Sequence, residues 1–152
     1  MKHFSVDWIL QNELAVGPAP RKKSHINLLN KKGIVAILSL CGEEEVFYED
    51  DTTIEHIENI FTCRRVVLPD HRVKTPLNLK QLNYALKELS EIILLGPVFV
   101  HCLAAVERSP LVCMAWLIRK HNLKPQQALD YVMQVHAGTS PLASQLKLLR
   151  EL

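Results

Sequence analysis

The sequence predicts an α/β fold: a three-layer-type sandwich with a central, mostly parallel sheet of about five strands flanked by helices. Two observations lead to this expectation. Short apolar runs rich in β-branched residues alternate with longer segments whose apolar residues recur every three or four positions. In the last third of the chain, helical patterns follow one another without an intervening strand. The 152 residues fit one domain with a single core, expected to span 1–152.

The first half of the chain predicts a hairpin, a helix and a buried strand. The hairpin strands are expected at Phe4–Leu10 and Glu13–Val16, the helix at Lys23–Lys32 and the third strand at Ile34–Leu40. Ser24 is the expected helix cap, and Gly33 ends the helix. The third strand is continuously apolar, which is typical of a strand buried on both faces.

The second half predicts two more strands and four helices. An acidic stretch at Gly42–Thr53, expected to be a solvated loop or helix edge, precedes them. The strands are expected at Arg64–Leu68 and Pro97–Val100, and the helices from Thr75-Pro76, from Ser109 to about Lys120, from Pro125 and from Ser140-Pro141. The strand ending at Val100 is expected to be central.

Composition excludes several classes of protein. A formal charge of +2 is too small to indicate nucleic acid or a membrane surface as partner. The longest apolar stretches are far shorter than the roughly 20 residues of a membrane helix, and no targeting segment is visible. Four cysteines without a CxxC pair suggest free thiols in a reducing compartment. We therefore expect a cytoplasmic protein, monomeric by default.

The segment between Val100 and the helix that begins at Ser109 carries the strongest functional signal. Ligands of α/β sheets bind at the carboxyl edge of the strands, and a helix start favours an anion there, whether phosphate or thiolate. Five residues separate Cys102 from Arg108, enough to surround a phosphate with backbone N–H groups. Arginine can bind two phosphate oxygens at once, and Ser109 can donate a hydrogen bond to the Cys102 sulfur. The N–H groups expected to bind phosphate are those of Leu103, Ala104, Ala105, Val106, Glu107 and Arg108.

In these residues the chain resembles the superfamily of cysteine-based protein phosphatases, whose signature is Cys, five residues, Arg, then Ser or Thr. His101 matches the histidine of the fuller pattern, and we expect it to orient the loop by hydrogen bonds. The short chain is most similar to the small dual-specificity branch. The resemblance implies a phosphomonoester hydrolase with Cys102 as nucleophile, no metal and no cofactor.

A second match lies 32 residues before Cys102. Leu68-Pro69-Asp70-His71-Arg72 forms a polar loop that Pro76 closes. In the family, an aspartate on a mobile loop about this far upstream protonates the leaving oxygen, so the resemblance implies this role for Asp70. A placed acid distinguishes an enzyme from a phosphate-binding module.

Two loop residues depart from the family pattern. Ala105 stands where glycine is usual, and if it adopts positive φ a strain of about 1–3 kcal/mol is expected. Glu107 would repel substrate if its carboxylate pointed inward. We expect it to face outward and to hold a neighbouring basic group, with a general-acid role as a reserve hypothesis.

The sequence leaves the substrate and two alternative functions open. The expected partner is a phosphorylated substrate, a protein with phosphotyrosine, phosphoserine or phosphothreonine, although a phosphoinositide or an RNA 5′-phosphate also fits such a loop. The departures at Ala105 and Glu107 allow a catalytically weak phosphate-binding module. A sulfur-transfer enzyme of the rhodanese type also uses a cysteine loop, but it leaves Asp70 unexplained.

Overall fold

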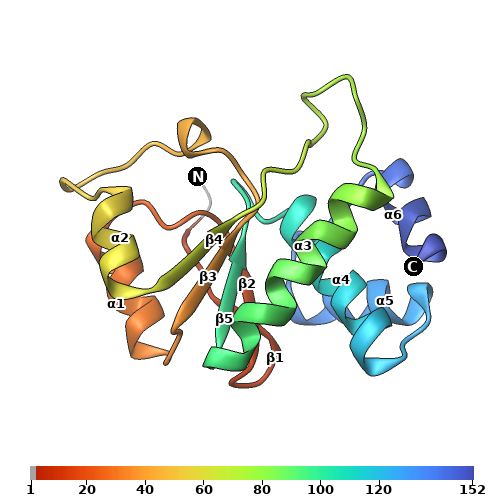
Figure 1. The fold of residues 1–152 in the computed structure, drawn as a ribbon, viewed down its shortest axis with the longest axis horizontal. Coiled ribbons are helices and arrows are strands. Elements are labelled where there is room, and N and C mark those ends of the chain that lie inside the picture. Colours follow the sequence, from red (N-terminus) through yellow and green to blue (C-terminus); the bar gives the residue numbers. More distant parts are fainter. Residues whose placement is uncertain (1–2) are drawn as a thin grey trace.

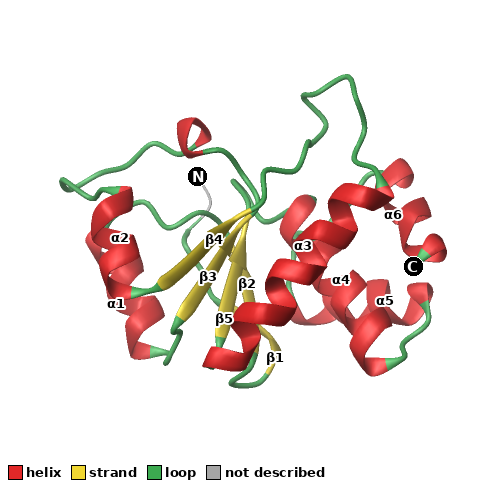
Figure 2. Ribbon diagram, viewed as in Figure 1, coloured by secondary structure: helices red, strands yellow, loops and turns green. Residues whose placement is uncertain are grey.

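The computed structural model describes residues 3–152 and places a five-stranded sheet between two layers of helices (Figure 1, Figure 2). The strands are β1 (Asp7–Leu10), β2 (Leu14–Gly17), β3 (Ala36–Ser39), β4 (Thr62–Arg65) and β5 (Val98–His101). Their order across the sheet is β1-β2-β5-β3-β4; β1 is antiparallel to β2, and the other neighbours are parallel. The predicted fold class and the central position of β5 are both confirmed.

Helices cover both faces of the sheet. The α-helices are α1 (Lys23–Lys31), α2 (Ile54–Ile60), α3 (Leu79–Ile92), α4 (Arg108–His121), α5 (Pro125–Val135) and α6 (Ala143–Leu148). Short 3-10 turns lie at Glu43–Glu45, Ile93–Leu95 and Leu149–Glu151. Figure 1 shows α1 and α2 on one side of the sheet and α3 to α6 on the other. No helix in residues 3–152 combines the length and apolar character needed to cross a bilayer.

Alternation along β5 separates the two larger clusters of the apolar core. Phe99 packs with β2, β3 and α1 residues on the α1–α2 side. Val98 and Val100 pack on the opposite side, against the helices α3 and α4. All three side chains are fully buried, because β5 is enclosed on both faces. The central strand therefore gives a rigid base to the segment that follows it.

Several element boundaries differ from expectation. The helix after the acid loop begins at Leu79 rather than at Thr75-Pro76, because Asn78 caps it and exchanges two hydrogen bonds with Gln81, at 2.8 and 3.0 Å. The residue preceding α1 is Lys22, so Ser24 lies inside the helix and does not cap it. The last helix starts at Ala143 instead of Ser140-Pro141.

The region around β4 shows the largest difference from the predicted elements. The strand expected at Arg64–Leu68 lies at Thr62–Arg65, although the N–H groups of Val66 and Leu68 still bond to carbonyls at the end of β3. The helix α2 was not expected at all. It is a seven-residue helix capped by the Thr53 side chain, and only Ile57 is buried in it. So short a segment offers too few turns to establish a helical period.

Candidate active site

The loop after β5 brings Cys102 and Ser109 together at the carboxyl edge of the sheet. β5 ends at His101 and α4 begins at Arg108, so the loop runs directly from the central strand into the helix. Cys102 Sγ lies 3.2 Å from Ser109 Oγ, and both residues are buried. The expected pair of sulfur and hydroxyl is therefore present, next to the unpaired N–H groups of a helix start.

Three carbonyls of the loop bond to the surrounding structure. The carbonyl oxygens of Leu103, Ala105 and Val106 accept hydrogen bonds from Ala19 N–H (3.1 Å), His136 Nε2 (2.7 Å) and Ser140 N–H (2.9 Å), respectively. In a trans peptide the N–H points opposite to the carbonyl. With these carbonyls turned outward, the N–H groups of the same peptides, which belong to Ala104, Val106 and Glu107, turn toward the inside of the loop.

Ala105 adopts the left-handed conformation that the glycine of the family pattern would adopt freely. Its φ is +59°, so the condition under which strain is expected at this position is met. This conformation costs an alanine about 1–2 kcal/mol. His136 compensates: its Nε2 donates to the Ala105 carbonyl, and its Nδ1 lies 2.6 Å from Asp7 Oδ2. The strained residue is thus tied to β1 through a buried imidazole.

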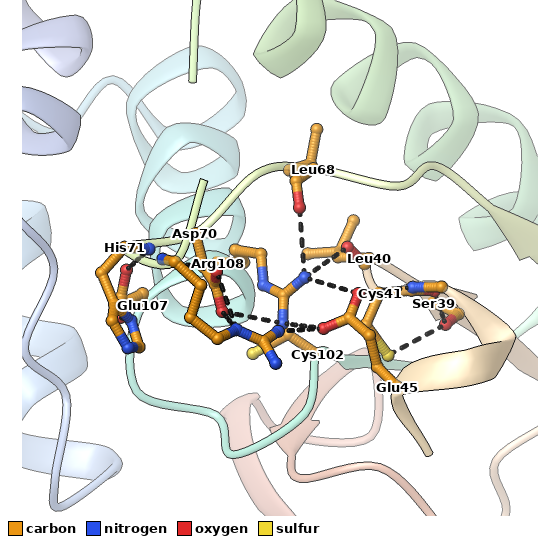
Figure 3. Close-up of polar contacts among 12 residues, drawn as sticks. Ser39, Leu40, Cys41, Glu45, Leu68, Asp70, His71, Cys102, Glu107 and Arg108 are labelled. Atoms are coloured by element: carbon orange, nitrogen blue, oxygen red, sulfur yellow. Dashed lines mark hydrogen bonds and ion pairs between the residues drawn. The ribbon is translucent and has the colours of Figure 1, made fainter. Parts of the chain in front are cut away.

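Arg108 is almost completely buried, at 3% exposure, and its guanidinium is held by carbonyls and carboxylates. Nη1 donates to the carbonyls of Leu40 and Leu68, at 3.4 and 3.1 Å. Nη1 and Nη2 donate to the two oxygens of Glu45, at 3.2 and 2.9 Å (Figure 3). Asp70 Oδ2 lies 3.5 Å from Nη2. This arrangement fixes one edge of the guanidinium.

Glu45 is not among the residues expected from the sequence, where its acidic stretch is interpreted as solvated. The structure places Glu43 and Glu44 in solvent, as expected, but turns Glu45 into the site. Burial raises the pKa of Glu45, but hydrogen bonds from Arg108, Gly42 N–H and Arg72 outweigh burial and hold that pKa below its ordinary value. Glu45 is therefore a carboxylate that neutralises Arg108.

Asp70 also lies at the site, within the same network of charges. Arg72 donates to it from Nε, at 2.9 and 3.1 Å, and from its N–H, at 3.0 Å, and also binds Glu45. Burial raises the pKa of Asp70, yet the hydrogen bonds from Arg72 and the charges of Arg108 and Arg72 together lower it. The structure thus brings Asp70, the residue that the family resemblance singled out, beside Arg108.

Glu107 faces away from Cys102, as expected. Its carboxylate binds His71, the residue after Asp70 (Figure 3). It also accepts a hydrogen bond from the amide of Gln145 in α6. The expectation that it holds a neighbouring basic group is confirmed, with His71 as that group.

His101 is a buried, neutral imidazole. Burial, together with the charges of Arg65 and Arg108, lowers the pKa of His101 to about 4. Its Nδ1 lies 2.9 Å from the Cys102 carbonyl, an acceptor, so the ring proton sits on Nδ1. The ring therefore contacts the backbone of the loop at its first residue.

The other three cysteines are thiols. Burial raises the pKa of Cys63 to about 11 and also raises the pKa values of Cys41 and Cys113. Cys102 differs from them in lying beside a helix start, with a hydroxyl 3.2 Å from its sulfur; Cys41 also has a hydroxyl nearby, that of Ser39, at 3.8 Å.

Cys102, Arg108 and Asp70 open onto one cavity of about 240 Å³, whereas the buried Ser109, Ala105 and His101 are not part of its lining. Its walls are formed by Asp70, His71, Arg72, Cys102, Leu103, Ala104, Val106, Glu107 and Arg108. Its base is the loop after β5, and the segment after β4 forms one side. The arrangement can bind a tetrahedral oxyanion between a sulfur, an arginine and a carboxyl group. Three residues around it, Glu45, His136 and Gln145, were not expected from the sequence, because no local motif includes them.

Comparisons with known proteins identify relatives in sequence and in fold. Residues 19–152 match the family model described as dual specificity phosphatase, catalytic domain. The chain is 27% identical over 150 residues to the mouse phosphatidylglycerophosphatase and protein-tyrosine phosphatase 1, covering 95% of this chain and 76% of that protein. It is 41% identical over 46 residues to human dual specificity protein phosphatase 5, which covers 30% of this chain but only 12% of that protein. The crystal structure of Tk-PTP in the active form superposes with a TM-score of 0.82 at 22% identity, covering 97% of this chain and 95% of that one.

Proposed function

The chain belongs to the dual specificity phosphatase family, and on that premise we propose that it hydrolyses phosphomonoesters through a phosphocysteine intermediate. The observation that carries the proposal is that Cys102, Arg108 and Asp70 line one cavity, with the buried Ser109 hydroxyl 3.2 Å from the Cys102 sulfur. Each supplies a different requirement of the reaction: a nucleophile, a donor to sulfur, a cation for phosphate and an acid.

In the first step, the Cys102 thiolate attacks phosphorus and forms an S–P bond while the bond from phosphorus to the leaving oxygen breaks. Arg108 holds two phosphate oxygens through its Nε–Nη2 edge, because Glu45 engages the Nη1–Nη2 edge. The loop N–H groups of residues 103–108 hold the others. Asp70 donates a proton to the leaving oxygen. A bound phosphate dianion raises the pKa of Asp70, since it places negative charge nearby and competes for Arg108.

In the second step, water attacks phosphorus, Asp70 accepts its proton, and the S–P bond breaks to release phosphate and thiolate. Ser109 donates a hydrogen bond to the departing sulfur, which lies 3.2 Å from its hydroxyl. His101 positions the start of the loop through the Cys102 carbonyl. Four groups thus carry a complete cycle.

Hydrolysis of an aryl phosphate in the presence of a chelator tests this mechanism. Cys102→Ser should abolish turnover and retain binding of inorganic phosphate. Asp70→Asn should slow turnover by about 10²–10⁴-fold for a leaving group of high pKa. Full activity in Cys102→Ser would refute the nucleophile, and full activity in Asp70→Asn would refute the acid.

Phosphorylated proteins, with phosphotyrosine or phosphoserine and phosphothreonine, are the substrates we propose. Similarity to a protein named as both phosphatidylglycerophosphatase and protein-tyrosine phosphatase also supports a lipid phosphate as the second candidate. Comparing kcat/KM for phosphotyrosine and phosphothreonine peptides with that for a soluble phosphoinositide separates the two. If both classes bind without turnover, the domain is a phosphate-binding module instead.

We also propose that residues 1–152 act as one domain. Support comes from the contacts that join distant parts of the chain to the loop: Asp7 in β1 through His136, and Gln145 in α6 through Glu107. The four free cysteines are compatible with the proposed cytoplasmic location.

A further inference from the structure

The segment that carries Asp70 has few contacts with the rest of the protein. Residues 71–76 are all exposed, and the chain between β4 and α3 extends away from the sheet and the helices (Figure 1). A loop with few buried contacts opens at low cost. The position of Asp70 over the site therefore depends on a small number of side-chain anchors.

One of these anchors is Glu107. Its Oε1 accepts a hydrogen bond from the His71 main-chain N–H at 3.2 Å, and its Oε2 lies 2.5 Å from His71 Nδ1. A carboxylate only accepts, so Nδ1 is the donor. The Glu107 side chain is 12% exposed, whereas the His71 side chain is 59% exposed. The largely buried carboxylate thus holds an exposed residue by its backbone and its ring together.

Glu107 is itself fixed from the opposite side. Gln145 Nε2 donates to Glu107 Oε1 at 3.2 Å, and Gln145 is buried at 3% exposure. Gln145 Oε1 accepts from Leu142 N–H at 2.8 Å, which orients the amide. Glu107 also precedes the first residue of α4, where a helix start favours negative charge. The carboxylate is therefore a fixed point that the loop can bind to.

The geometry constrains Asp70 directly. The N–H that binds Glu107 belongs to the peptide that joins Asp70 to His71, so holding it fixes the backbone of Asp70. A second anchor is Arg72, which binds both Asp70 and Glu45. Figure 3 shows Asp70 and Arg108 between the Glu107–His71 pair and Glu45.

We propose that Glu107 is a positioning residue that holds His71 and so keeps Asp70 above Cys102. This inference rests on the proposed function, because it assigns Asp70 as the acid. The inference also explains why a phosphate-binding loop contains an acidic residue: the Glu107 carboxylate points to the loop that carries Asp70 and not to the substrate.

Leaving-group dependence separates positioning from a general structural role. In Glu107→Ala and His71→Ala, kcat/KM for an aryl phosphate whose leaving group has a high pKa should fall about tenfold, a fraction of the general-acid contribution. For a leaving group of low pKa, which needs no protonation, it should change less than about twofold. His71→Asn, whose amide replaces the Nδ1 donor, should restore activity, and His71→Gln should not. Thr75→Ala, in the same loop, is the control.

Hydrogen exchange provides a readout independent of activity. Peptides covering residues 69–76 should exchange faster in Glu107→Ala and in His71→Ala than in the wild type, and the affinity of His71→Ala for inorganic phosphate should not change. Equal losses for both leaving groups, or exchange identical to that of Thr75→Ala, would overturn the proposal. Loss of activity in Glu107→Gln with normal activity in His71→Ala and His71→Gln would make Glu107 the acid and also overturn the proposal. If the wild type binds phosphate without hydrolysing esters, only the proposed function fails. The exchange result still shows whether Glu107 holds the loop that carries Asp70.

Discussion

Glu45→Gln tests whether the buried guanidinium of Arg108 is stabilised by the carboxylate of Glu45, which lies in the acidic turn after β3. Glutamine preserves the size and one acceptor of the side chain but removes its charge. Arg108 is 3% exposed and the Glu45 side chain 14% exposed, so the pair is largely removed from water. We expect the variant to be less stable and less active than the wild type.

The magnitude follows from what remains around the guanidinium. Removing one partner of a buried ion pair costs about 3–5 kcal/mol when the other charge is left uncompensated. Here Asp70 stays 3.5 Å from Nη2, and two carbonyls still accept from Nη1. We therefore expect the free energy of unfolding to fall by about 2 kcal/mol, below the full penalty. A less firmly held Arg108 should lower kcat/KM by about one to two orders of magnitude.

The pH dependence gives the prediction a sign. Folding lowers the pKa of Glu45. The stability that its carboxylate contributes is therefore fully present above the unfolded-state pKa of about 4.3 and is lost as the pH falls through the folded-state pKa. The stability difference between wild type and Glu45→Gln should therefore be full at pH 7 and shrink below about pH 4.

Urea unfolding and steady-state kinetics measure both effects. Glu44→Gln is the matched control, because Glu44 is an exposed neighbour in the same turn. If Glu45→Gln has the same stability and kcat/KM as Glu44→Gln, carbonyl groups and Asp70 suffice for Arg108, and the reasoning is refuted.

Three further predictions concern the loop itself. Because burial lowers the pKa of His101 to about 4 from 6.5, its unfolded form binds the proton first, and stability should fall by about 2 kcal/mol between pH 7 and pH 5; urea unfolding of His101→Asn should lack this component. Iodoacetamide at pH 7 should modify Cys102 ahead of Cys41 and Cys113, whose raised pKa values keep them as thiols, and inorganic phosphate should protect it; mass spectrometry showing equal labelling of Cys41 would contradict this. Ala105→Gly should relieve about 1 kcal/mol of strain but lose a buried methyl worth about 0.8 kcal/mol and add chain entropy of about 0.5 kcal/mol. Its unfolding free energy should consequently stay within about 1 kcal/mol of the wild type. A larger loss in thermal denaturation would show that relief of strain does not offset the lost methyl group and the added chain entropy.

The fold was predictable where the local pattern and the tertiary environment agree. β5 is apolar on both faces and lies at the centre of the sheet, so its sequence and its burial carry the same information. The helix from Pro125 begins at the residue that suits a first helical turn. In contrast, α2 has a single buried residue and is stabilised by its cap and its place beside β4, which no short apolar pattern records.

The same distinction explains which site residues could be predicted. Cys102, Arg108 and Ser109 lie within eight consecutive positions, so one strand–loop–helix unit fixes their geometry. Glu45 reaches Arg108 from a turn 63 positions away, because β3 and β5 are parallel neighbours and their carboxyl ends meet at one edge. An acidic cluster directly after a buried strand is therefore a candidate source of site residues and not only a solvated segment. In a parallel sheet, the residues just beyond the carboxyl end of each strand adjacent to the central one deserve consideration as partners of the central loop.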